Sequence, residues 1–360
     1  PMEDAVISFG NSGSDANDTH IKLLRYYHEA IGKPERRKII ARERSYHGVT
    51  IASAALTGLP VTQKHFDLPV DALGILRTDH PHYYRGKQGA ESEAEFVQRI
   101  VGNLERMILR EGPDSIAAFI AEPITGASGV IVPPADYYPQ VQAVLSKYGI
   151  LFWADEVITG FGRTGNDFGC TTMGIEPVDM MTFAKQLSSA YMPISASAVR
   201  RDMYEAMIDQ SAAAGAFGHG YTYSGHPVAC AVAIKVLEIY QRDNIFAKAA
   251  VTGEYLQRRL AEFTDHPLVG EVRGSGLIAA IELVANKATG EAFAGGAVGA
   301  YAQKAVQDRG VILRTVAGSS LAFCPPLIIT TEQIDEIIDA TSQALDQTLE
   351  YCRKEQLLVD

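Results

Sequence analysis

The sequence predicts an α/β fold, with a large N-terminal domain built on a mostly parallel sheet and a smaller α+β domain after it. Two observations favour this class. Short apolar segments alternate with helical patterns along residues 1–244, which is typical of a parallel sheet covered by helices. From residue 245 to 360 the pattern changes to a long helix, several short strands and a final helix. We therefore place the domain boundary between residues 244 and 245.

The elements of the first domain are predicted from the length and spacing of the apolar residues. Short uninterrupted apolar runs are typical of strands that are buried on both faces. They predict strands at 5–9, 38–41, 116–121, 150–154 and 180–184. Apolar residues at helical spacing, with Gly32 as a stop signal and Pro227 in a first turn, predict helices at 15–31, 136–147 and 227–240.

The second domain is predicted to contain a helix at 246–263, strands at 269–273, 277–284, 311–314 and 320–323, and a helix from residue 331. One stretch, RGSGLIAA at 273–280, matches the glycine pattern of dinucleotide-binding proteins and suggests a nicotinamide-dependent oxidoreductase as an alternative function. That pattern requires a helix after the glycines. Here a strand-like run follows them, so we do not favour this alternative.

The composition excludes several classes of function. The chain has 360 residues, of which 47% are hydrophobic and 21% charged, and its net charge is −11. Such an acidic chain lacks the basic face that nucleic acids and anionic membrane surfaces require. The cysteines are dispersed without a CxxC pair, which predicts a reduced, cytoplasmic protein without a zinc site. His80 and His82 have no evident third ligand, so we predict a surface loop and no metal there.

Candidate binding residues lie where the predicted strands end, because ligands of α/β proteins bind beyond the carboxyl ends of strands. In GNSGSDAND, Gly13 and Ser14 lie between a strand and a helix. A helix start offers free N–H groups and a partial positive charge, which favours a phosphate site. The alternative is a plain helix N-cap, since Ser and Asp are preferred at that position.

Two charged residues follow neighbouring predicted strands. Asp155 ends the apolar run of GILFWADEV, and because an unpaired buried carboxylate is costly, either solvent or a cation such as a protonated pyridine nitrogen must reach it. Lys185, in TFAKQLSS, follows the next strand. A desolvated lysine has a lowered pKa and is a competent nucleophile that can hold an aldehyde cofactor as a Schiff base. The alternatives are solvated or ion-paired loop charges, or a pair formed by these two residues.

These stretches together resemble the class III aminotransferases, which are pyridoxal-phosphate (PLP) enzymes of fold type I. The matching stretches, in the family's order, are NSGSDANDT, SYHG, AEPITGASG, WADEVITGFGRTG, TFAKQLSSAYMP and GYTYSGHP. The resemblance is closest to omega-amino acid and amine:pyruvate transaminases. It implies a seven-stranded large domain and the ping-pong transfer of an amino group from an amine or omega-amino acid to pyruvate or a similar keto acid. An aminomutase, a decarboxylase or a non-catalytic PLP-fold protein remain alternatives.

The resemblance also assigns roles to residues. It implies that Lys185 carries the cofactor and moves the substrate proton, and that Asp155 keeps the pyridine nitrogen protonated. Tyr46 is implied to stack on one face of the ring and Val157 on the other, since alternate strand residues point the same way. The remaining residues implied to bind the cofactor are Gly13 and Ser14 at the phosphate, His47 and Glu122 near the ring, and Thr222.

Two of the implied residues concern the assembly and the substrate. Thr222, in GYTYSGHP, matches a threonine that reaches the phosphate from the partner subunit, which implies a homodimer with shared active sites. Arg314, in VILRTVAG, ends a predicted strand and matches a mobile arginine that binds the carboxylate of the amino acceptor. A planar guanidinium suits a carboxylate, although a surface arginine is the alternative. Arg314 and Tyr46 are therefore the predicted substrate-binding residues.

The sequence departs from the family's pattern in two places. The residue after the lysine is usually glycine but is Gln186 here, which predicts a changed local turn with little effect on the chemistry. Family members also carry an N-terminal segment that helps to form the substrate pocket. Because the sequence begins with PMEDAVISFG, we expect that this segment, with the aromatic residues that it contributes to specificity, is missing.

Overall fold

The computed structural model describes residues 1–359 and divides the chain into two compact units. The first unit comprises Pro1–Thr125, Pro133–Phe161 and Phe168–Asp243. The second unit comprises Gly126–Val132, Gly162–Asp167 and Asn244–Asp360. Two short segments from the middle of the chain thus belong to the second unit, in addition to everything that follows Asp243. Neither segment could be recognised from composition.

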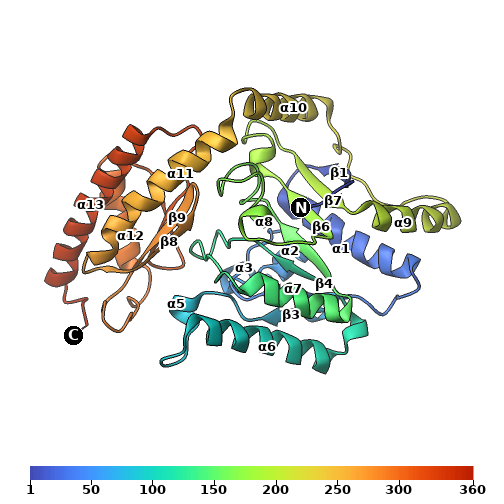
Figure 1. The fold of residues 1–360 in the computed structure, drawn as a ribbon, viewed down its shortest axis with the longest axis horizontal. Coiled ribbons are helices and arrows are strands. Elements are labelled where there is room, and N and C mark those ends of the chain that lie inside the picture. Colours follow the sequence, from blue (N-terminus) through green and yellow to red (C-terminus); the bar gives the residue numbers. More distant parts are fainter. Residues whose placement is uncertain (360) are drawn as a thin grey trace. The chain divides into compact units, whose positions relative to one another are not determined.

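A seven-stranded sheet forms the centre of the first unit, in the order β1-β7-β6-β5-β4-β2-β3 (Figure 1). The five strands from β6 to β3 run parallel, whereas β7 is antiparallel to β6 and β1 is antiparallel to β7. The predicted mostly parallel sheet is therefore confirmed. Its strands are β1 Val6–Gly10, β2 Lys38–Arg42, β3 Ile75–Thr78, β4 Ile116–Ala121, β5 Leu151–Asp155, β6 Met180–Phe183 and β7 Ser195–Val199.

Helices cover both faces of this sheet, and each face has its own apolar core. One core joins α6 and α7 to side chains such as Phe119 and Phe152, and the other joins α1, α2 and α9 to side chains such as Ile120 and Trp153. The helices of this unit are α1 Gly13–Ala30, α2 Ile51–Leu56, α3 Pro60–Gln63, α4 Val70–Leu73, α5 Tyr83–Gly86, α6 Glu93–Glu111, α7 Tyr137–Tyr148, α8 Gly169–Thr172, α9 Arg201–Ala214 and α10 Pro227–Arg242, with 3₁₀ turns at Pro113–Ser115 and Lys185–Leu187.

The two cores show which way the strand residues point. Phe152 belongs to the core under α6 and α7, whereas Trp153 belongs to the core under α1. Because side chains alternate along a strand, Asp155 lies on the same side as Trp153. In β6, Met180 packs in the α1 core and Met181 in the other, so Thr182 also lies on the α1 side. The end of β5 therefore presents its carboxylate toward α1.

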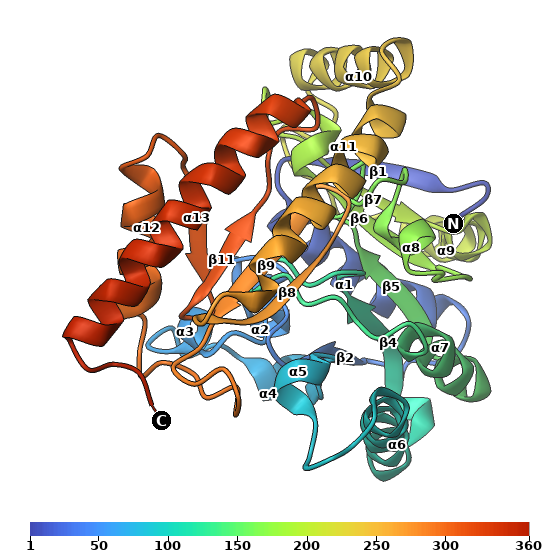
Figure 2. The same ribbon diagram turned by 60° about the vertical axis from the view of Figure 1, so that its left-hand side comes forward.

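A four-stranded antiparallel sheet, in the order β10-β11-β9-β8, forms the second unit together with three long helices. Figure 2 shows α13 lying alongside α12, which it contacts. Arg163, in one of the two inserted segments, donates to the carbonyls of Leu277, in the turn between β8 and β9, and of Pro325, shortly after β11. The elements are α11 Ile245–Ala261, a 3₁₀ turn at Glu262–Asp265, β8 Val269–Ser275, β9 Ile278–Leu283, α12 Ala297–Gln307, β10 Arg314–Val316, β11 Ser320–Phe323 and α13 Thr331–Lys354.

Two predictions about local structure were wrong. The strand predicted at 311–314 begins only at Arg314, because the tight turn after Val316 pairs that residue with Ser320 and so fixes where the hairpin starts. The strand predicted at 5–9 is confirmed as β1, which pairs with β7 in the antiparallel direction at the edge of the sheet. His82 is buried, not part of a surface loop.

Among the helices that the structure describes, none combines the length and the apolar character that crossing a bilayer requires.

Candidate active site

A cavity of about 260 Å³ in the first unit lies where β5 and β6 end and α1 begins. The structure brings to this cavity most of the residues that the sequence singled out. The predicted residues that line it are Gly13, Ser14, Tyr46, His47, Glu122, Asp155, Val157 and Lys185. The predicted Thr222 and Arg314 do not line it. Thr222 lies in an exposed turn of the first unit, and Arg314 is exposed on β10 of the second unit.

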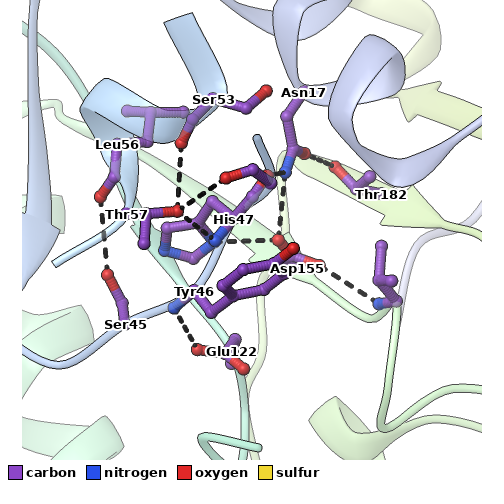
Figure 3. A network of polar contacts seen from close by, with 12 residues as sticks. Asn17, Ser45, Tyr46, His47, Ser53, Leu56, Thr57, Glu122, Asp155 and Thr182 are labelled. Atoms are coloured by element: carbon purple, nitrogen blue, oxygen red, sulfur yellow. Dashed lines mark hydrogen bonds and ion pairs between the residues drawn. The ribbon is translucent and has the colours of Figure 1, made fainter. Parts of the chain in front are cut away.

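Asp155 is almost completely buried and accepts three hydrogen bonds (Figure 3). Its Oδ2 accepts from His47 Nδ1 at 2.8 Å and from Asn17 Nδ2 at 3.1 Å, and its Oδ1 accepts from the backbone N–H of Val157 at 3.2 Å. Donors within the chain therefore supply part of the stabilisation that the buried carboxylate of Asp155 needs. Burial alone raises the pKa of Asp155, but the hydrogen bonds from His47, Asn17 and Val157 outweigh it and hold the pKa below its ordinary value.

The adjacent acid, Glu156, has a different role. Its carboxylate accepts from the hydroxyl of Thr159 and from the backbone N–H groups of Gly169 and Cys170, at the start of α8. Burial raises its pKa, against the direction of these hydrogen bonds. The two neighbouring acids therefore have pKa values displaced in opposite directions, and the one with the lowered pKa is the one that lines the cavity.

The position of Val157 has a different cause from the one expected. The strand ends at Asp155, so the alternation of side chains along a strand does not place Val157. Val157 lies instead in the following turn, whose N–H donates to Asp155. The side chain of Val157 also comes close to the start of α1, since a Cβ on Gly13 would lie 3.0 Å from one of its methyl groups. Glycine at position 13 is therefore what lets the helix approach this turn.

The loop that carries Tyr46 and His47 is held from three sides. The backbone N–H of Tyr46 donates to Glu122 Oε1 at 2.9 Å, and that of His47 donates to Thr57 Oγ1 at 2.9 Å. Gly48 has a φ of +127°, and a Cβ there would lie 2.5 Å from Ser14 Oγ. The loop therefore needs glycine both for its backbone conformation and for its close contact with α1.

The start of α1 combines both of the alternatives weighed from its sequence. Ser12 is the N-cap and forms a capping box with Asp15, so these two residues make the plain cap. The N–H groups of Gly13 and Ser14, the first two residues of the helix, have no acceptor within the helix because of helical geometry. Both residues line the cavity, where those N–H groups and the helix dipole favour an anion.

Lys185 follows β6 in an unusual backbone conformation. Its φ is +45°, which is uncommon for a residue with a side chain and is typical of functional sites and tight turns. Lys185 is exposed, so the desolvation that we expected for its amine is not a property of this chain by itself. The hydroxyl of Tyr240 lies 2.9 Å from the backbone oxygen of the next residue, Gln186, and 3.1 Å from its Oε1, so its single proton is shared between these two acceptors. These bonds tie the turn that carries Lys185 to α10.

The sequence analysis did not identify the residues that support the site through buried hydrogen bonds. Asn17 contacts Asp155 from α1, and the buried Arg42 donates to the backbone oxygen of Glu122 at 2.6 Å and to Thr125 Oγ1 at 3.2 Å. One signal was available, since Asn17 and His20 occupy the face of α1 that otherwise bears apolar residues such as Leu24. A polar residue on an apolar helix face needs a partner, but the sequence does not say which one.

The dinucleotide alternative has no structural support. In RGSGLIAA, Gly274 lies within β8 and Gly276 in the turn to the antiparallel β9, so a strand and not a helix follows the glycines. A strand–turn–helix unit is what the dinucleotide pattern requires.

Comparison with known proteins agrees with the fold and with this site. The family model described as Aminotransferase class-III matches residues 1–345. The chain is 49% identical over 341 residues to "Gamma aminobutyrate transaminase 3, chloroplastic" of Solanum lycopersicum, with 94% of the chain and 65% of that protein covered. It is 46% identical over 345 residues to "Vanillin aminotransferase" of Capsicum chinense, with 96% and 74% covered.

Solved structures give the same result at the level of the fold. A structure entitled "Transaminase with L-ala" is 51% identical, has a TM-score of 0.95 and is matched over 98% of this chain and 82% of its own. The omega transaminase of Pseudomonas jessenii in complex with PMP is 48% identical, with a TM-score of 0.94 and coverage of 98% and 77%. The chain belongs to the class III aminotransferases. It spans 65% of the length of each of two tomato relatives.

Proposed function

We propose that this chain is a PLP-dependent transaminase that moves an amino group from an amine or omega-amino acid to pyruvate or a similar keto acid by a ping-pong mechanism. The observation that carries the proposal is the shared cavity of Asp155, Lys185 and the start of α1. Relatives named for gamma-aminobutyrate and vanillin support omega-amino acids and amines as the donor class. The structure with L-ala supports the alanine–pyruvate pair as the other half of the reaction.

The residues around the cavity fit this cofactor. They supply a buried carboxylate with a lowered pKa, an amine and an anion-binding helix start, which are the partners of a pyridinium, an aldehyde and a phosphate. Within the described residues, the Nε2 atom of His47 is buried at this cavity without a hydrogen-bond partner. When bound, PLP supplies a ring that withdraws electrons from the amine carbon of the substrate.

In this proposal each protein group has a distinct task. Lys185 holds the cofactor covalently and then moves a proton to and from the amine carbon of the substrate. Asp155 accepts the hydrogen bond of the ring nitrogen and keeps that nitrogen protonated, because its own pKa is low. Tyr46 and Val157, which line the cavity, would cover the faces of the ring, and the N–H groups at the start of α1 would bind the phosphate. Glu122 fixes the backbone of Tyr46 through its carboxylate.

The substrate and the assembly complete the proposal. Tyr46 lines the cavity and contacts the substrate there. Arg314, whose guanidinium is exposed on β10, binds the carboxylate of the keto acid, because a planar guanidinium suits a carboxylate. Thr222 reaches the phosphate of a second subunit, so the active form is a homodimer; its exposed position supports a role outside its own subunit. We also propose a reducing location such as the cytoplasm, in keeping with four free cysteines, to be checked by cell fractionation.

Half-reaction spectroscopy tests the proposed reaction. The purified protein, incubated with PLP, is expected to become yellow, to lose the colour with amines or omega-amino acids, and to regain it with pyruvate or another keto acid. The mutant Lys185→Ala should not show this cycle. Turnover of the amino compound that needs no keto acid and leaves the colour unchanged would point to a decarboxylase or aminomutase instead.

Covalent attachment is tested separately. Borohydride treatment of the PLP-loaded protein is expected to fix the cofactor on the peptide that contains Lys185, as seen by mass spectrometry, and not on that of the Lys185→Arg mutant. A colourless protein with unmodified Lys185 under excess PLP would contradict the proposal and would support a non-catalytic protein of this fold.

A further inference from the structure

A continuous chain of polar side chains lies beneath Asp155, inside the apolar layer between α1 and the sheet. Asn17 Nδ2 donates to Asp155 Oδ2, and Thr182 Oγ1 donates to Asn17 Oδ1 at 2.7 Å (Figure 3). Trp153 Nε1 donates to Thr182 Oγ1 at 2.8 Å, and His20 Nδ1 lies 3.1 Å from the same oxygen. None of the side chains behind Asp155 exposes more than 1% of its surface.

Such a chain is not expected from packing alone. The surroundings are apolar, since Ile21 and Leu24 of α1 and Met180 of β6 belong to the same core. A buried polar group without a partner costs about 1–3 kcal/mol. An apolar residue at position 182 would avoid this cost. A threonine there is therefore expected to be held by hydrogen bonds to its neighbours.

The direction of the hydrogen bonds can be worked out from the acceptors at one end. The amide of Asn17 faces both the carboxylate of Asp155 and the backbone oxygen of His47, the latter at 2.6 Å. Neither oxygen has a proton when the carboxylate is ionised, so Asn17 must turn its NH₂ group to them and its oxygen to Thr182. The single hydroxyl proton of Thr182 is therefore used on Asn17.

That assignment fixes the state of His20. Since Thr182 has no second proton to give, His20 must donate to it from Nδ1. Burial lowers the pKa of His20 to about 3, in spite of the nearby Asp155, so the ring is neutral and carries only this proton. A backbone contact with Ala198 raises this pKa against the effect of burial, whereas Nε2 makes no hydrogen bond of normal geometry within the described residues.

We propose that Asn17, Thr182 and His20 are positioning residues, which orient the Asp155 carboxylate toward the cofactor. Their hydrogen bonds all point the same way, since each residue donates to the next one, from His20 to Asp155. Oδ2 of Asp155 accepts from Asn17 and His47, while among residues 1–359 only the backbone N–H of Val157 donates to Oδ1. A carboxylate oxygen has room for a further donor, so the chain reserves Oδ1 for the ring nitrogen. This inference rests on the proposed function for its purpose, but not for its hydrogen-bond pattern.

The pattern is tested without cofactor. In the protein labelled with ¹⁵N-histidine, the His20 signals, assigned with the His20→Gln mutant, are expected to show a protonated Nδ1 and an unprotonated Nε2 at neutral pH. In Thr182→Val this preference for Nδ1 should be lost, and in Thr182→Ser it should be kept. A His20 ring protonated at Nε2 in the unmodified protein would mean that Thr182 donates to His20, which overturns the proposal.

The effect on the cofactor is tested with the same variants. Thr182→Val is expected to weaken PLP binding about tenfold, the loss typical of one charge-linked hydrogen bond, and Thr182→Ser to restore it. Ser197→Ala is the matched control, because Ser197 also joins the sheet to α1 through a buried bond, to the oxygen of Ala16 at 3.1 Å, but lies outside the chain. Thermal unfolding of each variant, measured without PLP, separates a loss of folding from a loss of positioning.

The outcomes distinguish the two proposals. Equal PLP affinity in Thr182→Val, Thr182→Ser and Ser197→Ala would refute the positioning role while leaving the transaminase proposal intact. Conversely, a protein with the expected His20 tautomer that does not bind PLP at Lys185 would refute the proposed function and retain only the hydrogen-bond pattern.

Discussion

Asp155 illustrates how a single side chain depends on its immediate partners. Replacing it with alanine leaves the ring N–H of His47 and one N–H of Asn17 buried without an acceptor, and removes the acid that lines the cavity. Loss of one partner of a buried charged pair costs roughly 3–5 kcal/mol. We therefore expect Asp155→Ala to weaken PLP binding and to lower kcat by at least about a hundredfold.

A PLP titration and steady-state kinetics measure these two effects. Asp155→Asn is the control for shape, since it keeps the hydrogen-bonding size but not the charge, and we expect it to bind PLP better than Asp155→Ala while remaining slow. An Asp155→Asn protein with unchanged kcat would show that the charge at this position is not needed.

His20 makes the stability of the protein sensitive to acid. Burial lowers its pKa from 6.5 to about 3, and burial also lowers the pKa of His28 to about 4. Between those values and 6.5 the unfolded chain binds protons that the folded chain does not, so the free energy of unfolding falls as the pH falls. Each histidine contributes a slope of about 1.4 kcal/mol per pH unit in that range.

Urea unfolding at a series of pH values from 7 downward measures this slope. His20→Asn keeps a donor toward Thr182 but does not titrate, so we expect its slope to be reduced by about one proton. His28→Asn serves as an independent comparison at a site remote from the chain of Asn17 and Thr182. An unaltered slope in His20→Asn would show that His20 is already protonated in the folded protein.

Among the structural elements, the loop of Tyr46 to Gly48 is where a backbone change should affect the cavity. Gly48→Ala would place a Cβ 2.5 Å from Ser14 Oγ in a conformation with positive φ. We expect a several-fold loss of PLP affinity and a free energy of unfolding lowered by about 1–3 kcal/mol, since both the loop and the start of α1 must shift.

A second glycine variant serves to separate the effect of backbone strain from the effect of a steric clash. Gly32 also has a positive φ, of +71°, but a Cβ there meets nothing within 4 Å. Gly32→Ala is therefore expected to lower the free energy of unfolding by about 1 kcal/mol and to leave PLP affinity unchanged. If both variants bound PLP equally well, the contact between Gly48 and α1 would have no part in forming the site.

The elements also show what a sequence can and cannot predict. Strands buried on both faces, such as β4 and β5, appear as continuous apolar runs, and the residues at their ends include Glu122 and Asp155. The small residues of β7 and the short β3 give no such run, and both strands were missed. The start of β10 was wrong because hairpin pairing, which depends on the turn, decides it.

The contacts that support the site residues are even less predictable from the sequence. Asn17 is 138 positions from Asp155, and Thr182 is 165 positions from Asn17. Nothing in the local pattern around Thr182 distinguishes it from an ordinary strand residue. Its role follows only from the way in which α1 crosses β5 and β6. The residues that line the cavity could therefore be identified by resemblance, whereas the contacts that support them could be found only in the structure.

In the complete assembly, Thr222 and Lys185 are proposed to come from different subunits of one active site. Thr222 is exposed and does not line the cavity of its own chain, although the neighbouring Tyr221 anchors the same segment to α1 by donating to the oxygen of Asp15 at 3.0 Å. A threonine held at the surface in this way suits a phosphate that belongs to the other subunit. The proposal makes a specific prediction about mixed dimers.

Lys185→Ala and Thr222→Ala subunits, each impaired alone, are expected to regain activity when they are unfolded together and refolded as a mixture. In a hybrid dimer one site combines two altered residues, while the other combines an intact Lys185 with an intact Thr222, so each hybrid has one complete site. With equal amounts, half of the dimers are hybrids, and the mixture should reach about a quarter of the unmodified activity. If Thr222 acted within its own subunit, no hybrid site would be complete, and the mixture would show only the average of the two impaired proteins.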